Sequence, residues 1–333
     1  MADPGVGEAD AARTVRTRKD EPVSNGDLLV DEVESGEVSE GEGGGEPQPV
    51  TAEGLEAVGF VLPEGPPPAE VAAAEVAELE EGLRDIGEAS YGPPTVTAPA
   101  PGARIAEIVQ DTDDRVEIAH TERYPWRAHA SLRIVAADGS LWVGTGWFIS
   151  PRVLITAGHV VHIKNSGVAG RDGWVREIKV MPGRKGTELP FGSSTSVRFY
   201  SVRGWAEDGD EEFDYGAIVL ADPLGDRTGW FAFGAYSDAE LATLTANISG
   251  YPGEKPAGTQ WYHGRRVDST SNRKVFYATD TTGGQSGSAV YRIKGGQRSA
   301  FAVHTYGGAR VNSGTRITRP VFDNLTAWKA AHP

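Results

Sequence analysis

From about residue 115 onward, the chain consists of short segments rich in β-branched and aromatic residues, separated by turn sequences. Turn signals such as residues 138–139 (DG) and 252–253 (PG) lie between these segments. Many short strands with few helices predict an all-β fold, an antiparallel sandwich or barrel. Within this part of the chain, only residues 319–331, with apolar side chains at helical spacing, are predicted to form a helix, at the C-terminal end. The expected strands are residues 131–136, 141–149, 153–156, 215–220, 246–250, 274–279, 288–293 and 300–304.

Charge and aromatic content divide the chain near residue 107. Residues 1–107 contain 24 acidic and 6 basic residues, a net charge of −18, whereas residues 108–333 contain 23 acidic and 26 basic residues, a net charge of +3. All eight tryptophans lie in the second part. The first part has too little apolar surface to offset its conformational entropy, so we expect a mostly disordered, acidic, Gly/Pro-rich arm. One helix is expected in it, near residues 69–89, where Ala, Glu and Leu are concentrated.

The composition of the whole chain excludes several classes of function. Without cysteine there is no disulfide framework, no Cys-ligated zinc or iron–sulfur cluster, and no cysteine nucleophile. A net charge of −15 argues against a general nucleic-acid binder. No run approaches the 18 apolar residues of a membrane span, and the first 20 residues lack the apolar core of a signal peptide.

Two segments of the β-rich part carry residues suited to acid–base chemistry. His159 comes directly after the expected strand 153–156 on a turn of small residues, where a rigidly held imidazole can act as a general base. Asp214 precedes the apolar strand 215–220 and can accept a hydrogen bond from an imidazole N–H, which fixes its tautomer. Taken alone, each residue has a structural alternative: a buried histidine, and a solvated end to the acidic run 207–212.

A third segment, residues 280–289 (DTTGGQSGSA), places Ser286 among glycines. Glycines let the backbone approach a substrate carbonyl, and the N–H groups of Gly284 and Ser286 can point together at a developing oxyanion. A glycine-rich loop without catalysis is the alternative. The segment differs from the nucleophile elbow of α/β-hydrolases, because a glycine follows Ser286 directly. Together, His159, Asp214 and Ser286 have the chain order of chymotrypsin-like serine proteases.

From about Asp114 to its C-terminal end, the sequence resembles the bacterial glutamyl endopeptidases of the staphylococcal type. The similar segments are residues 114–122 (DRVEIAHTE), 156–159 (TAGH), 249–256 (SGYPGEKP) and 281–288 (TTGGQSGS). Two residues depart from the family pattern: Gln285 stands where Asn is also common, and Ala289 stands where Pro is usual. Neither of them is a reacting group. The resemblance implies two six-stranded antiparallel barrels over residues 108–333, with the active site between them and the C-terminal helix at the end.

The resemblance also implies a mechanism. Ser286 Oγ attacks the peptide carbonyl while His159 takes its proton, Asp214 orients and stabilises the imidazolium, and the N–H groups of Gly284 and Ser286 hold the oxyanion. Water then hydrolyses the acyl-enzyme. This chemistry needs no cofactor and implies protein or peptide substrates, and we expect a monomer that binds neither nucleic acid nor membrane.

For specificity, the resemblance points to Thr281 and His304 as the residues that hold the carboxylate of a substrate glutamate. A Thr hydroxyl and a His that can donate suit a carboxylate. Gly307 is expected to offer its backbone for pairing with the bound peptide. Asp280, however, lies six residues before Ser286, where trypsins carry the acid that binds Lys or Arg. Because trypsins lack the histidine, we expect cleavage after Glu, and less after Asp; cleavage after Lys or Arg through Asp280 stays open.

The resemblance further places the mature amino terminus near Ile108, whose free α-amine would help to bind the acidic side chain. The Glu107-Ile108 bond is one that the expected specificity allows the enzyme to cut. We therefore expect residues 1–107 to be a propeptide or regulatory arm that inhibits the enzyme until processing. A passive solubilising tail is the alternative.

Other readings of the sequence are weaker. Residues 207–212 lack EF-hand spacing and are expected to be a solvated loop. The rival class of function is a catalytically idle trypsin-like domain that binds through its cleft. The resemblance favours secretion, whereas the lack of a signal peptide leaves a cytoplasmic location, with activation by a partner protein, open. No metal site is expected, because we see no metal-ligand cluster among His120, His129, His162, His263 and His332.

Overall fold

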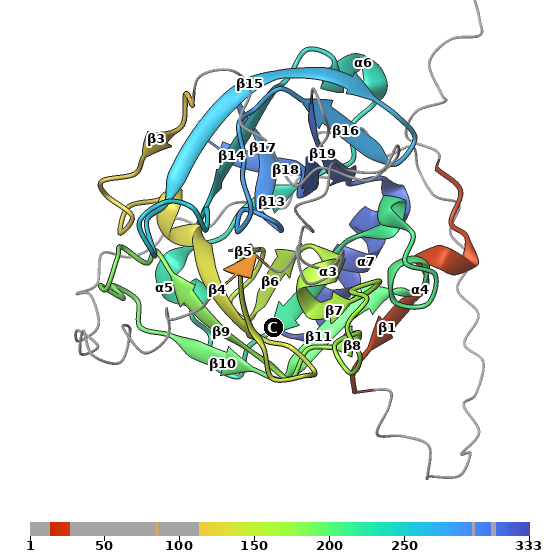
Figure 1. The fold of residues 1–333 in the computed structure, drawn as a ribbon. Coiled ribbons are helices and arrows are strands. Elements are labelled where there is room, and N and C mark those ends of the chain that lie inside the picture. Colours follow the sequence, from red (N-terminus) through yellow and green to blue (C-terminus); the bar gives the residue numbers. More distant parts are fainter. Residues whose placement is uncertain (1–13, 27–83, 86–112, 295–296, 308–310) are drawn as a thin grey trace, which may run out of the picture.

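The computed structural model describes residues 14–26, 84–85, 113–294, 297–307 and 311–333. Strands dominate this part of the chain, and two large sheets lie one above the other in Figure 1. The prediction of an all-β fold is therefore confirmed. Within the described residues, no helix has both the length and the apolar character that a membrane crossing requires.

The first sheet, called the first barrel below, carries the residues expected to act as acid and base. Of the two six-stranded barrels that the resemblance implies, this one does not close in the described residues, because its strand path ends at β1 and β10, which do not pair with each other. Its strands alternate between side chains that enter the core, such as Leu132 and Ile134, and side chains that face outward, such as Arg133. Two short additions extend it: β1 pairs antiparallel with β11, and β2 pairs parallel with β5. In spatial order the strands are β1 (Pro22–Ser24), β11 (Arg198–Val202), β12 (Gly216–Val219), β6 (Val153–Thr156), β5 (Leu141–Phe148), β4 (His129–Val135), β9 (Glu177–Pro182) and β10 (Ser194–Ser196).

The second sheet carries the expected nucleophile and specificity residues, and it closes into a barrel of six strands. Closure follows because β18 pairs antiparallel with both β17 and β19. Two short strands are added at its margins, β13 (Ala232–Phe233) on β18 and β3 (Val116–Glu117) on β15. The six barrel strands are β14 (Thr245–Gly250), β15 (Trp261–Thr270), β16 (Lys274–Tyr277), β17 (Ala289–Lys294), β18 (Gln297–Gly307) and β19 (Asn312–Arg316).

The predicted C-terminal helix is confirmed as α7 (Arg319–Ala331), which buries Val321, Leu325 and Trp328 against the first core. Pro320 lies in its first turn, where a missing N–H costs nothing. The remaining regular elements are short connections. They are η1 (Arg18–Asp20), η4 (Trp126–Ala128), α3 (Gly158–Val161), β7 (His162–Ile163), β8 (Gly173–Trp174), α4 (Arg203–Ala206), η5 (Glu211–Phe213), α5 (Gly225–Thr228) and α6 (Asp238–Leu241).

Several strands were not among those expected from the sequence: β9, β10, β11, β15 and β19. Strand β15 explains why. Its sequence, WYHGRRVDST, is mostly polar because one face of the barrel is solvated, and it is held by pairing with β14 on one side and β16 on the other. A strand whose stability comes from its neighbours carries little local signal.

Two predictions about the acidic arm, residues 1–107, are corrected by the structure. Residues 14–26 are not separate from the folded domain, because β1 extends the first sheet beside β11 (Figure 1). Most of the predicted helix 69–89 lies outside the described residues, but Arg84–Asp85 form the strand β2 and not a helix. Strand β6 pairs with β5 only at Trp147 and Phe148, which leaves the backbone of β5 near Trp142 open for pairing with β2. A segment that pairs with a strand edge must itself be extended, so residues 84–85 cannot be helical here.

Candidate active site

His159 and Asp214 form a buried pair in the first barrel. The imidazole Nδ1 lies 2.7 Å from a carboxylate oxygen of Asp214, and the backbone N–H of His159 donates to the other oxygen at 2.8 Å. Both residues have a relative accessibility of 0%. A side chain at Gly158 would place its Cβ 2.9 Å from the Asp214 carboxylate, so only glycine allows this approach. Two hydrogen bonds thus fix the carboxylate and the imidazole relative to each other.

The electrostatics of the pair favour an ionised aspartate. Burial alone would raise the pKa of Asp214, but the charge and hydrogen bond of His159 lower it, with a further contribution from Lys274, and the net direction is down. An ionised carboxylate accepts the Nδ1 proton of a neutral imidazole, which leaves Nε2 as the basic nitrogen. The backbone of Asp214 is held as well, since the Thr315 hydroxyl donates to its carbonyl at 3.0 Å.

The loop that carries Ser286 packs directly on the segment that leads into His159. Gly287 has φ +89°, and a Cβ there would lie 2.1 Å from the Thr156 hydroxyl and 2.9 Å from the Ala157 nitrogen. From the first barrel, Thr145 donates its N–H to the Ser286 carbonyl at 2.9 Å. The structure therefore brings the loops of the two barrels into contact at the predicted nucleophile.

The Gly-Tyr-Pro-Gly motif supports the other end of this loop. Gly253 donates its N–H to the Gly283 carbonyl at 2.6 Å. Gly284 has φ +97°, and a Cβ there would lie 2.5 Å from the Tyr251 carbonyl oxygen. Its carbonyl accepts from the Thr145 hydroxyl at 2.8 Å. The glycines of the nucleophile loop are thus required by close backbone packing, in addition to any role toward a substrate.

Arg115 holds the same loop from outside the two barrels, a role that sequence reasoning missed. Its side chain is 1% exposed and forms ion pairs with Asp113 and Glu254. It also donates to the Thr282 hydroxyl at 2.7 Å and to the Gln285 side-chain oxygen at 3.0 Å. The one sequence feature that could have indicated this role is the place of Arg115 in the segment 114–122, which resembles the family. From its acidic neighbours alone, an arginine at this position would be predicted to be exposed.

The predicted pocket residues lie on two neighbouring segments of the second barrel. His304 is fully buried on β18, with Nδ1 2.7 Å from the Tyr277 hydroxyl. Thr281 is also fully buried, and within the described part of the chain its hydroxyl has no hydrogen-bond partner. Gly307 ends β18. Ile108, the expected mature amino terminus, lies outside the described residues.

Asp280 is fully buried, and its recorded partners lie toward β15 and the Asp114 segment. Its carboxylate accepts the backbone N–H of Asp114 at 3.1 Å and lies 3.2 Å from Nδ1 of His263, the same atom that accepts the Asp280 N–H at 2.9 Å. His263, one of the five histidines in which the sequence shows no metal-ligand cluster, thus lies beside two carboxylates. The ligand atoms of the three residues lie within 4.8 Å of one another, close enough for a metal, but hydrogen bonds already occupy His263 Nδ1 and the carboxylate of Asp280.

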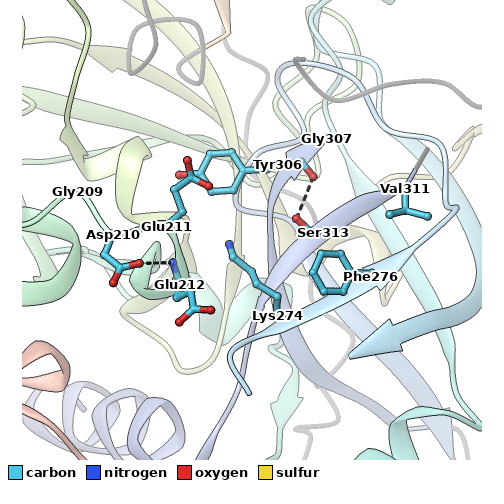
Figure 2. A pocket seen from close by; sticks show the side chains of 10 residues that line it. All are labelled: Gly209, Asp210, Glu211, Glu212, Lys274, Phe276, Tyr306, Gly307, Val311 and Ser313. Carbon is cyan, nitrogen blue, oxygen red and sulfur yellow. Dashed lines mark hydrogen bonds between the residues drawn. The ribbon is translucent and has the colours of Figure 1, made fainter. Parts of the chain in front are cut away.

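A pocket of about 570 Å³ adjoins this site, between the acidic loop before Asp214 and the end of β18 (Figure 2). Figure 2 shows Lys274 between the two sides, and its Nζ donates to the Thr305 hydroxyl at 3.1 Å and lies 4.7 Å from the centre of the Tyr306 ring. The residues that line the pocket are Gly209, Asp210, Glu211, Glu212, Lys274, Phe276, Tyr306, Gly307, Val311 and Ser313.

Comparison with known proteins decides the family. No protein-family model matches the chain. Over 240 residues the chain is 41% identical to the glutamyl endopeptidase of Bacillus licheniformis, and the match covers 70% of this chain and 72% of that protein. The chain belongs to the glutamyl endopeptidase family. Over 258 residues it is also 34% identical to a Bacillus subtilis protein named extracellular metalloprotease, covering 77% of this chain and 80% of that one.

Comparison with solved structures supports the same assignment for the fold of this chain. A Glu endopeptidase in complex with MPD superposes with a TM-score of 0.59 at 27% identity, covering 67% of this chain and all of that chain. The protease Anisep from Arthrobacter nicotinovorans superposes with a TM-score of 0.52 at 17% identity, covering 61% and 96%, and it supports the fold alone. The trypsin-like fold predicted from the sequence is confirmed, and the chain is a serine protease of the glutamyl endopeptidase type.

Proposed function

We propose that the chain is an endopeptidase that hydrolyses the peptide bond after Glu, and more slowly after Asp, with Ser286, His159 and Asp214 as its catalytic triad. The observation that carries the proposal is the fully buried His159–Asp214 pair, bonded at 2.7 Å, together with the packing of the Ser286 loop on Thr156 and Ala157, which lead into His159. A buried carboxylate costs desolvation energy, and a carboxylate–imidazole pair beside a glycine-rich serine loop is more readily explained by catalysis than by stability.

The mechanism follows from the tautomer that Asp214 imposes. With its proton on Nδ1, His159 accepts the Ser286 hydroxyl proton at Nε2 as Oγ bonds to the substrate carbonyl carbon. The carbonyl π electrons move to oxygen, and the N–H groups of Gly284 and Ser286 stabilise that oxyanion. His159 then gives the proton to the leaving amine as the C–N bond breaks. Water, deprotonated by His159, finally cleaves the acyl ester and restores Ser286.

The proposed preference for Glu rests on Thr281 and His304. When the Tyr277 phenol donates to Nδ1 of His304, the proton of the neutral ring is on Nε2, which can donate to a carboxylate. The buried hydroxyl of Thr281 supplies a second donor. The backbone N–H of Asp114 donates to the Asp280 carboxylate, which supports this choice over Lys or Arg, because it engages the acid that would attract a cation.

A panel of peptides that differ only in the residue before the scissile bond tests this function. Glu, Asp, Lys, Arg and Leu peptides are incubated with the full chain and, separately, with the chain cut at the Glu107-Ile108 bond, and products are identified by mass. We expect cleavage after Glu to exceed cleavage after Asp, and no cleavage by the Ser286→Ala protein. Cleavage after Lys or Arg would assign the pocket to Asp280, and binding of peptides without any cleavage would support the idle binding domain.

We also propose that the acidic arm keeps the enzyme latent until the Glu107-Ile108 bond is cut. Strand β2 supports this, because Arg84–Asp85 pair with β5 at Trp142 and Val143, two residues before Thr145, which contacts the nucleophile loop. Intact-mass measurement of the protein before and after it gains activity tests the proposal. A new amino terminus at Ile108 is expected, and full activity of the uncut chain would contradict latency.

A further inference from the structure

The N-terminal residues 14–26 are anchored in the folded domain by a buried ion pair. Asp20 is fully buried, and its two carboxylate oxygens accept from the two terminal nitrogens of Arg273 at 2.8 and 2.9 Å. The same carboxylate accepts the backbone N–H of Thr17 at 2.8 Å. Strand β1 then pairs antiparallel with β11, and Asn25 adds side-chain bonds to the backbone of Phe199 at 2.9 Å and of Val197. Bidentate pairing of this kind fixes both position and orientation.

The partners of this segment flank the proposed catalytic aspartate in the sequence. The Arg273 guanidinium that binds Asp20 lies 3.9 Å from the centre of the Phe213 ring. On the other side of Asp214, the Tyr215 hydroxyl accepts from Asn324 at 2.7 Å, and the same amide group donates to the carbonyl of Asp20 at 2.8 Å. Both neighbours of Asp214 are therefore held by groups that Asp20 itself binds.

The segment also joins two sides of the pocket in Figure 2. Lys19 forms an ion pair with Asp210 at 2.9 Å, in the acidic loop of the pocket. Arg273, bound by Asp20, directly precedes Lys274, which begins β16 on the opposite side and whose side chain lies between the two sides. One short segment therefore connects the loop before Asp214 in the first barrel with the start of β16 in the second.

We propose that residues 14–26 are a permanent component of the working protease, in which Asp20 and its partner Arg273 are positioning residues for Asp214. The segment acts through Phe213 and Tyr215, and it keeps the Asp214 carboxylate at hydrogen-bond distance from His159. Since it lies in the arm that the proposed processing would cut off, it stays bound as a separate peptide after cleavage of the Glu107-Ile108 bond.

The test compares Asp20→Asn with Glu21→Gln in the full chain. Both changes turn a carboxylate into an amide, but Glu21 pairs with Arg203 at the surface, where its side chain is 51% exposed. The first readout is the NMR resonance of the His159 Nδ1 proton in a Ser286→Ala background, which requires neither substrate nor processing. The second is kcat per active site, counted with a serine-reactive phosphonate, together with KM.

We expect Asp20→Asn to shift or broaden the Nδ1 proton resonance and to lower kcat about tenfold, with KM changed less than twofold. Glu21→Gln leaves all three unchanged. If Asp20→Asn unfolds, Asn25→Ala, which only loosens the docking of β1, should move the resonance in the same direction by less. A lower melting temperature with an unchanged resonance and an unchanged kcat per site would overturn the positioning role.

Retention has its own readout, which rests on the proposed processing. After cleavage, native mass spectrometry should show the fragment with residues 14–26 bound to residues 108–333, and the two should separate in denaturant. Loss of that fragment with full activity would overturn the proposal. Failure of the chain to cleave any Glu peptide would instead count against the proposed function, because the resonance in the Ser286→Ala chain is measured without substrate.

Discussion

The two barrels bring different kinds of groups to the site between them. In the first barrel, His159 and Asp214 are already bonded to each other and buried, so the proposed acid–base pair is assembled without a substrate. In the second barrel, the hydroxyl of Thr281 is buried and lacks a partner among the residues that the structure describes. The difference fits the proposed function, in which the first barrel supplies preassembled chemistry and the second supplies a recognition site that a substrate carboxylate completes.

The largest expected effect is loss of the nucleophile at the point where the barrels meet. Ser286→Ala should lower kcat about 10⁶-fold, because the remaining site can no longer form an acyl-enzyme. The matched control is Ser288→Ala, which removes a buried hydroxyl from the same loop two residues later. We expect Ser288→Ala to retain activity within a few-fold. Equal losses from the two changes, measured by peptide hydrolysis, would mean that the loop and not the Ser286 hydroxyl matters.

A smaller loss is expected from breaking the preassembled pair in the first barrel. Asp214→Asn should lower kcat about 10⁴-fold, because an amide can donate to Nδ1 of His159 and so favours the tautomer that lacks a basic Nε2. Asp280→Asn, a like change in the second barrel, should cost less than tenfold on a Glu peptide. Kinetics of both proteins on that peptide compare the barrels directly. The reverse order of losses would assign the essential carboxylate to Asp280.

In the second barrel, the expected effect depends on the substrate. Thr281→Val keeps the shape of the side chain but removes the hydroxyl, and a hydrogen bond to a charged group contributes about 1.5–3 kcal/mol. We therefore expect kcat/KM on the Glu peptide to fall about 10- to 100-fold. Slow cleavage of a Leu peptide, if measurable, should not fall. A uniform loss on all peptides would show that Thr281 supports the loop and does not recognise the carboxylate.

The smallest expected effect is the pH dependence of the free energy of unfolding, which we expect to depend on two buried histidines, one in the first barrel and one in the short sheet of β7 and β8. Burial lowers the pKa of His129, on β4, and of His162, on β7, to about 4 each. The unfolded chain binds these protons near pH 6.5, so stability is present above that pH and is lost as the pH falls toward 4. Each histidine contributes a slope of up to about 1.4 kcal/mol per pH unit in that window.

Denaturant unfolding of the Ser286→Ala chain at pH 7 and pH 5 measures this loss. His129→Gln should reduce the difference between the two pH values, whereas the exposed His120→Gln should leave it unchanged. An equal difference in all three proteins would contradict burial of a neutral His129.

Much of this arrangement could be predicted from the sequence, and the reason is that its signals are local. The catalytic segments are short strings in which glycines and one polar residue adjoin a strand, and α7 shows its apolar spacing within 13 residues. The positions of Arg115, Lys274 and Asp20 could not be predicted in this way. Asp20 and Arg273 are 253 residues apart, and each lies in a polar sequence that gives no sign of burial. Buried polar residues depend on partners that only the folded chain brings together.

The most direct test of the central claim is covalent capture of the nucleophile by a substrate-like inhibitor. The protein is treated with paired diphenyl phosphonates whose side chains mimic Glu and Lys, and the modified residue is mapped by peptide mass spectrometry. The account predicts that the Glu phosphonate modifies Ser286, that the Lys phosphonate reacts far more slowly, and that Thr281→Val narrows the difference. Modification of another residue, or faster reaction with the Lys phosphonate, would contradict it.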